Sequence, residues 1–152
     1  MRDEDLVDEL RNLMAADFTW ERNKSSPKDL ELYLLAQGDL RHMAQQASCH
    51  QEIAYGGCFA VAILAEFEKP IREIGPWFYN RLFWECGVID QLLYLGAEII
   101  GFRGCGIGCS FDDFVHRMLG LTGMEFQDLY HFAVGKALED KRLITLPPFS
   151  LA

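Results

Sequence analysis

The chain has 152 residues, of which 50% are hydrophobic and 12% aromatic, and its 14 basic and 23 acidic residues give a formal charge of −9 at pH 7. A chain of this length forms one domain with a buried core, and its apolar content argues against disorder. The negative charge would repel a phosphate backbone or an anionic membrane surface, so we expect neither nucleic acid nor a membrane as a partner.

The cysteines and the amino terminus suggest where the protein resides. There are five cysteines, an odd number, and the acidic start Met1-Arg2-Asp3-Glu4-Asp5 has no apolar signal stretch behind it. We therefore expect a reducing, cytoplasmic setting. Charged residues interrupt the most hydrophobic region before it reaches the roughly 18 apolar residues of a membrane span; they are Arg81, Glu85, Asp90 and Glu98.

The amino-terminal segment predicts one helix and a connection. From Asp3 to Ala16, apolar residues recur at steps of three and four, as in an amphipathic helix. The polar segment 21–27 ends in Pro27 and predicts a linker. We therefore divide the chain into a helix and linker at 1–27 and a domain at 28–152.

The middle of the chain predicts a strand, a turn and a helix, and then a central strand. The apolar run 30–35 predicts the first strand, and Asp39 stands at a helix-capping position before a helix at 40–48. The run from Cys58 to Ala65 is continuously apolar, which is typical of a strand covered on both faces. We expect this run to be the central strand.

The longest predicted element is a helix from about Phe78 to Ile100. Its apolar residues follow a helical period, but Trp84, Val88 and Leu95 lie outside the main stripe, so the helix is apolar nearly all round. Such a helix must be buried on most faces, and one small domain offers too little protein for that. We expect a second subunit to cover it.

The last third predicts shorter elements. Gly106-Ile107-Gly108 reads as a loop, 112–119 as a helix closed by Gly120, and 129–135 as a strand. Two prolines make the tail 143–149 extended.

Several side chains suggest chemistry that their context does not favour. Cys105 and Cys109 have neither the spacing of Cys-x-x-Cys nor two further ligands, so small buried cysteines are the favoured interpretation over a metal or redox site. Asp112 and Asp113 start a helix, where capping is favoured over a carboxylate pair. The histidines are scattered and no serine or cysteine has a nucleophile context, so triad chemistry has no support; they are His42, His50, His116 and His131.

Two segments suggest ligand contacts. The glycines of segment 104–108 allow a backbone to approach a ligand closely, and a flat neutral ring suits them better than a phosphate because acids follow. Lys136, Lys141 and Arg142 form a late basic cluster that is either a phosphate site or a solvated turn.

Three ordered segments resemble the nitroreductase family, especially its SagB-type branch. The segments 79–87 and 91–98 resemble the long core helix of that family, 101–113 is similar to the loop and helix that follow, and 129–135 with 140–143 and 146–148 is similar to the carboxyl end. The likeness covers about residues 30–149, which corresponds to the carboxyl-terminal half of the family's fold.

The resemblance implies an α+β fold that is incomplete at its amino terminus, with a central antiparallel or mixed sheet and a long buried core helix. It also implies a homodimer or a nitroreductase-like partner subunit, FMN at the subunit interface, and NAD(P)H as electron donor. By position, Gly106, Ile107 and Gly108 would lie near the isoalloxazine ring and Arg142 near the FMN phosphate. The flavin would perform the transfer, and no catalytic side chain is identified.

One family motif is missing before residue 30. Family members carry an Arg-x-Ser helix that grips the phosphate, and Arg11-Asn12-Leu13 does not match it. Each lost charge-assisted hydrogen bond costs about 1.5–3 kcal/mol, so Arg142 alone would hold FMN weakly. Two alternatives therefore stay open: a non-catalytic, nitroreductase-like binding or scaffolding subunit, and a stand-alone small-molecule-binding domain.

Overall fold

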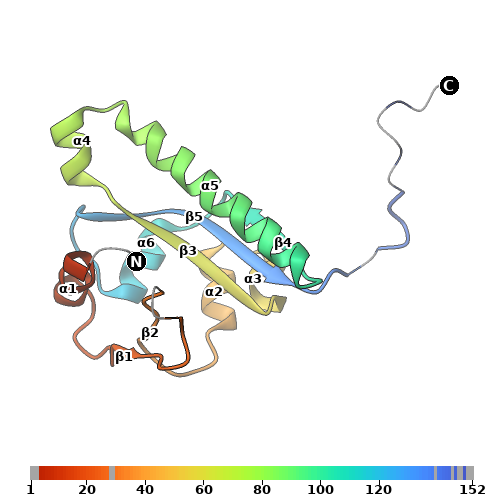
Figure 1. Cartoon of the computed structure of the whole chain (residues 1–152), viewed down its shortest axis with the longest axis horizontal. Helices are drawn as coiled ribbons and strands as arrows, with labels where there is room; N and C mark the ends of the chain where they lie inside the picture. Colours follow the sequence, from red (N-terminus) through yellow and green to blue (C-terminus); the bar gives the residue numbers. More distant parts are fainter. Residues whose placement is uncertain (1–3, 28–29, 139, 145, 147–148, 150–152) are drawn as a thin grey trace.

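The computed structural model of the chain describes residues 4–27, 30–138, 140–144, 146 and 149. Helices and strands are mixed along the described residues (Figure 1). In chain order they are α1 Glu4–Leu13, β1 Glu21–Arg22, β2 Tyr33–Leu34, α2 Arg41–Ala47, α3 Glu52–Gly56, β3 Phe59–Glu66, α4 Glu68–Ile74, α5 Phe78–Ile99, β4 Arg103–Ile107, α6 Asp112–Leu119 and β5 Phe126–Gly135.

The main sheet of the described residues is antiparallel and has the strand order β3-β5-β4. The predicted strand at 58–65 is confirmed as β3, but its predicted central position is wrong, because β5 lies in the middle. An apolar run indicates that the faces of a strand are covered but not which strands lie beside it, so it cannot distinguish the two positions. In this chain β3 is exposed along its first half, and the ring of Phe59 is half exposed.

Helices cover both faces of this sheet (Figure 1). The predicted long helix is confirmed as α5, which lies along one face and packs on β4 and β5. Helices α2, α3 and α6 lie on the opposite face (Figure 1). The α5 side chains that face the sheet recur at helical spacing and are Leu82, Cys86, Asp90 and Ala97.

The opposite side of α5 is apolar and exposed. An exposed stripe runs along this side at helical spacing and consists of Trp84, Val88, Leu92, Leu95 and Ile99. The helix therefore carries two apolar stripes, and the sheet buries only one of them. A single protomer therefore leaves a contiguous apolar stripe uncovered along α5.

A β-bulge in β5 changes which side chains share a face. Ile63 pairs with Tyr130 and Leu64 pairs with Asp128, so Leu129 is the extra residue. Because of this extra residue, Leu129 and Tyr130 both pack with the cluster under α5. Asp128 and His131, which are three residues apart, consequently lie on the same opposite face, and their side chains meet.

The amino-terminal region is attached to the main sheet through α1. The amphipathic helix is confirmed, and its Leu10 packs with Leu121 and Phe126. Within the segment predicted as a linker, Glu21–Arg22 form β1, which pairs with β2 to make a short hairpin. The hairpin crosses residue 27, and the division of the chain at that residue stays a prediction.

Candidate functional site

The glycines of β4 face aromatic side chains of the protein itself. A Cβ added to Gly104 would lie 2.4 Å from Cζ of Phe132, and one added to Gly106 would lie 2.7 Å from Oη of Tyr130. The backbone N–H of Gly106 also donates to Oη of Tyr94 at 2.7 Å. These glycines let α5 and β5 place their rings directly against β4, which a larger residue would prevent.

The three residues of the predicted ring-binding loop, 106–108, therefore do not share one environment. Gly106 and Ile107 belong to β4 and are not in a loop. The side chain of Ile107 is buried with Ala54 and Ala133 on the face opposite α5. Gly108 follows the strand and is exposed, so it is the one of the three that borders an open cavity.

Asp90 is a buried acidic residue on the side of α5 that faces the sheet, and its carboxyl group lies close to Gly106. A Cβ on Gly106 would lie 3.4 Å from Oδ2 of Asp90, and Oδ1 of Asp90 has no hydrogen-bond partner among the described residues. Burial raises the pKa of Asp90 because the charged form is desolvated. Burial and the nearby Asp90 also raise the pKa of Tyr130. This site favours neutral groups, so a second anion would not be stable here.

The cavity beside Gly108 has a volume of about 530 Å³, which lies within the usual range for small-molecule sites. Three aromatic side chains form one wall: the ring centroids of Tyr79 and Phe83 are 5.1 Å apart, and those of Tyr79 and Phe67 are 6.0 Å apart. Leu129, from the bulge, also lines the cavity. A flat apolar ring would find both a glycine backbone and aromatic faces here.

The rim of this cavity is polar and acidic. Asp112 accepts a hydrogen bond from Nε2 of Gln127 at 2.8 Å, and Ser110 lies beside it. Among the described residues that line the cavity, none is lysine or arginine. The cavity therefore fits an uncharged ring, and a phosphate group would have to lie outside it.

Arg142 lies apart from the Gly108 cavity. Its side chain is 89% exposed and forms a short ion pair with Asp140, which keeps the pKa of that carboxyl below its usual range. The described residues that follow β5 lead away from the sheet (Figure 1). The ion pair uses Nε and one N–H of Nη2, so within the described chain Nη1 and the second N–H of Nη2 are the donors left for an anion. A single protomer therefore does not bring the two predicted halves of the FMN site together.

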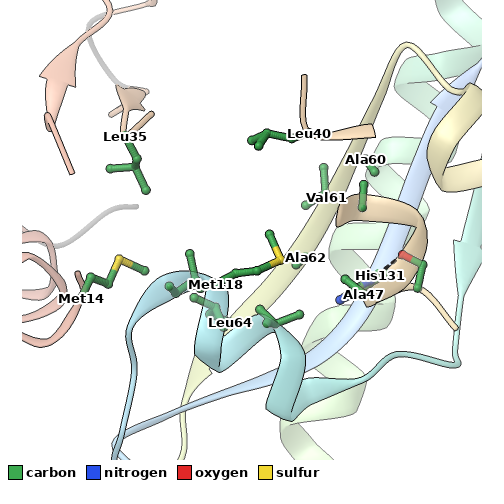
Figure 2. Close-up of a pocket in the computed structure, with 14 residues that line it drawn as sticks. Met14, Leu35, Leu40, Ala47, Ala60, Val61, Ala62, Leu64, Met118 and His131 are labelled. Atoms are coloured by element: carbon green, nitrogen blue, oxygen red, sulfur yellow. Dashed lines mark hydrogen bonds between the residues drawn. The ribbon is translucent and has the colours of Figure 1, made fainter. Parts of the chain in front are cut away.

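A second cavity, of about 370 Å³, lies on the other face of the sheet and is almost entirely apolar. Figure 2 shows Met14 and Leu35 on one side of it and Ala60 and Ala62 of β3 on the other. Its only polar side chains among the described lining residues are Ser48 and His131.

These two side chains belong to a buried chain of three residues. Oγ of Ser48 lies 2.8 Å from Nδ1 of His131, and Nε2 of His131 lies 3.0 Å from Oδ2 of Asp128. The sequence alone did not predict this arrangement, because the serine lies 83 positions before the histidine. Since only 1% of Ser48 is exposed, we assign the three residues a role in holding α2 to β5.

The structure also corrects the interpretation of Cys109 as a small buried cysteine. Cys109 is exposed and forms a disulfide with Cys49, which directly follows Ser48. Cys105 is a free, half-buried thiol. The partner of Cys109 is 60 residues away, so the spacing of the two cysteines near Gly108 held no information about the bond.

The other predicted groups do not converge. His42 contacts Tyr55, and His50 contacts Phe111, in each case ring against ring. Asp112 and Asp113 lie in the first turn of α6, as predicted, but the capping position is occupied by Phe111, which makes no side-chain capping hydrogen bond. Among the described residues, no three His, Cys, Asp or Glu side chains are grouped so that they could hold a metal ion. No helix in the described part of the chain is long and apolar enough to cross a bilayer.

Comparison with solved structures shows a nitroreductase-like fold. The chain is similar to a putative nitroreductase from Anabaena variabilis, with a TM-score of 0.65 and 24% sequence identity. The similarity covers 72% of this chain and 22% of that one, so the chain spans about a fifth of the length of the solved protein. No protein-family model and no curated protein matches the sequence.

Proposed function

We propose that this chain is part of an FMN-dependent oxidoreductase of nitroreductase type, related to the SagB-type branch, with NAD(P)H as electron donor. The observation that carries the proposal is the Gly108 cavity, which has a glycine backbone and an aromatic wall at the edge of a nitroreductase-like sheet. In this proposal the isoalloxazine ring lies in that cavity, and the flavin supplies the hydride or electron transfer when it is bound.

The protein's part in this chemistry is to hold and shield the ring. Gly108 lets the ring approach the backbone, while Phe67, Tyr79 and Phe83 exclude water from one side of it. Gly106 and Ile107 support the site from within β4. We assign no catalytic side chain.

The phosphate would be held by Arg142, and we propose that a second subunit brings this residue to the ring. The exposed stripe of α5 supports a dimer, because it is the surface that a single protomer leaves uncovered. An incoming phosphate would have to compete with Asp140 for the guanidinium group. FMN binding is therefore weaker than a complete arginine grip would give. We further propose that the protein acts in the cytoplasm as part of a larger assembly.

Titration of the pure protein with FMN and with riboflavin, followed by flavin fluorescence, tests this function. We expect binding to quench the fluorescence of both ligands. FMN should reach half-saturation at a lower concentration than riboflavin, because only FMN carries the phosphate. Replacement of Tyr79, an exposed aromatic residue of the wall, by alanine (Tyr79→Ala) should weaken the binding of both ligands. Trp77→Ala is the matched control, since Trp77 is similarly exposed, lies two residues before Tyr79 and does not line the cavity.

The alternative is a non-catalytic binding or scaffolding subunit that keeps the nitroreductase-like fold without a flavin. The acidic rim of the cavity, which has no lysine or arginine among its described lining residues, favours it. A colourless protein that quenches neither FMN nor riboflavin would support this alternative and exclude the oxidoreductase proposal. A third possibility, a stand-alone small-molecule-binding domain, requires a monomer in solution.

A further inference from the structure

The corner formed by residues 47–50 after α2 is held by three different links. The carbonyl oxygen of Ala47 accepts the N–H of Phe111 at 2.8 Å. Ser48 hydrogen-bonds to His131, and Cys49 is bonded to Cys109. Two of the three links thus reach the segment 109–111, which directly follows Gly108.

The backbone of this corner is in a conformation that most residues avoid. Cys49 has a φ of 52° and His50 a φ of 59°, and both are left-handed without being glycine. Such residues persist only where surrounding contacts hold them, because their side chains crowd the backbone. The disulfide is the covalent contact that holds this corner.

A small thiol can reach the disulfide from the Gly108 cavity. Cys109 is exposed and lines that cavity together with Ser110, whereas Cys49 is half-buried. An attacking thiolate must approach a sulfur along the S–S bond, so access decides which sulfur reacts. Cys109 is the accessible one.

The third thiol near the core does not serve as an internal reductant. Cys86 is buried on the side of α5 that faces the sheet, and desolvation together with nearby Asp90 raises its pKa to about 11. A thiol of that kind is almost entirely protonated at neutral pH and is a poor nucleophile. Cys86 is therefore not the reductant of this disulfide, and a thiol outside the chain can serve as the electron donor.

We propose that Cys49–Cys109 is a thiol–disulfide exchange site that reacts with low-molecular-weight thiols, with Cys109 as the sulfur attacked. A thiolate RS⁻ bonds to Sγ of Cys109 while the S–S bond breaks, and Cys49 leaves as a thiolate. A second thiolate then attacks the RS sulfur of the mixed disulfide, so RSSR is released and Cys109 leaves as a thiolate. Both cysteines become thiols when they take up the two protons that the reacting thiols lost. Two electrons pass from the two RSH molecules to the Cys49–Cys109 disulfide. In the reverse reaction, RSSR oxidises the two cysteines to the disulfide. No flavin takes part, so the site is independent of the function proposed above.

The reduced corner keeps its non-covalent links. The Phe111 hydrogen bond to Ala47 and the ring contact of His50 with Phe111, 5.7 Å between centroids, do not depend on the sulfur atoms. Reduction therefore changes the rim of the Gly108 cavity and leaves the protein folded. In a reducing compartment, a disulfide that persists is usually catalytic or redox-sensing rather than structural.

The test is a glutathione titration of the full chain carrying Cys58→Ser and Cys105→Ser, which removes the other accessible thiols. After equilibration at graded ratios of reduced to oxidised glutathione, free thiols are alkylated and mapped by mass spectrometry, and folding is followed by circular dichroism. We expect Cys49 and Cys109 to gain the alkyl label together while the protein stays folded. If the disulfide is reduced only when the protein unfolds, the bond is purely structural. If Cys49 and Cys109 stay reduced in oxidised glutathione, the disulfide does not form. Either result overturns the proposal.

Single replacements identify the reacting sulfur. With oxidised glutathione, Cys49→Ser should gain one glutathione at Cys109, whereas Cys109→Ser should gain much less at Cys49, which is half-buried. Equal or reversed labelling would contradict the assignment of Cys109. If either variant loses its fold, the titration of the parent chain still decides whether the pair exchanges.

Discussion

Ser48 and His131 are 83 residues apart in the chain, and their side chains meet at 2.8 Å in the interior. The contact joins the end of α2 to the central strand β5, and it exists because the bulge at Leu129 turns His131 toward α2 and Asp128 toward His131. The hydrogen-bonded chain therefore depends on an irregularity of the strand.

Removal of the hydroxyl group should destabilise the protein. Ser48→Ala leaves a buried ring nitrogen of His131 without its partner, and an unsatisfied buried polar atom costs about 1–3 kcal/mol. Urea unfolding should show this loss in the free energy of unfolding. Ser25→Ala, in an exposed turn, should change stability by less than about 0.5 kcal/mol. Equal effects would mean that the buried bond contributes nothing.

A methyl group on the first glycine of β4 should be poorly tolerated. Gly104→Ala would place a Cβ 2.4 Å from the ring of Phe132, which is fully buried and cannot move away. We expect a loss of about 1–3 kcal/mol, measured by thermal unfolding. Gly38→Ala is the control, because a Cβ there meets no atom within 4 Å. A Gly104 variant as stable as the control would mean that the rings do not pack as described.

The buried carboxyl of Asp90 should make stability depend on pH. Its pKa is raised in the folded state above the ordinary value of 3.8, so the folded protein holds this proton more tightly than the unfolded chain. The contribution of Asp90 to the free energy of unfolding therefore falls as pH rises from 3.8 through the folded pKa. Asp90→Asn should remove this part of the slope in urea unfolding at a series of pH values. Asp17→Asn, on the surface, should leave the slope as it is in the parent protein.

A charge on the exposed stripe of α5 should prevent self-association. Leu92 lies at the middle of the stripe and is 64% exposed in one protomer, so Leu92→Glu would bury a carboxylate in any dimer formed there. Sedimentation velocity should then show a monomer where the parent chain is a dimer. Leu32→Glu, an exposed site on the hairpin side, should leave the dimer intact. A parent chain that is itself monomeric would exclude the proposed dimer.

Replacement of Arg142 should separate phosphate binding from ring binding. Arg142→Ala should weaken FMN binding about tenfold or more, because a charge-assisted hydrogen bond is lost. Riboflavin, which has no phosphate, should bind as before. Arg72→Ala removes a comparably exposed, ion-paired arginine on α4 and should affect neither ligand. An unchanged FMN affinity would remove Arg142 from the site.

Features that depend on neighbouring residues could be predicted from the sequence. The helical period of 78–100 predicts α5 almost to the residue, and Gly120, with a φ of 76°, ends α6 as its position suggests. Both features follow from contacts within a few residues of one another, so local sequence carries enough information to specify them. The likeness of three ordered segments to a nitroreductase fold was also visible at this level.

Only the tertiary structure decided how distant segments meet. It placed β5 instead of β3 in the centre of the sheet, put Gly106 in a strand against Tyr130, and joined Cys49 to Cys109. Strand order, ring packing and disulfide pairing each depend on which surfaces come together when the whole chain folds. Periodicity records only that a residue is buried, and the identity of its partner is a property of the folded molecule.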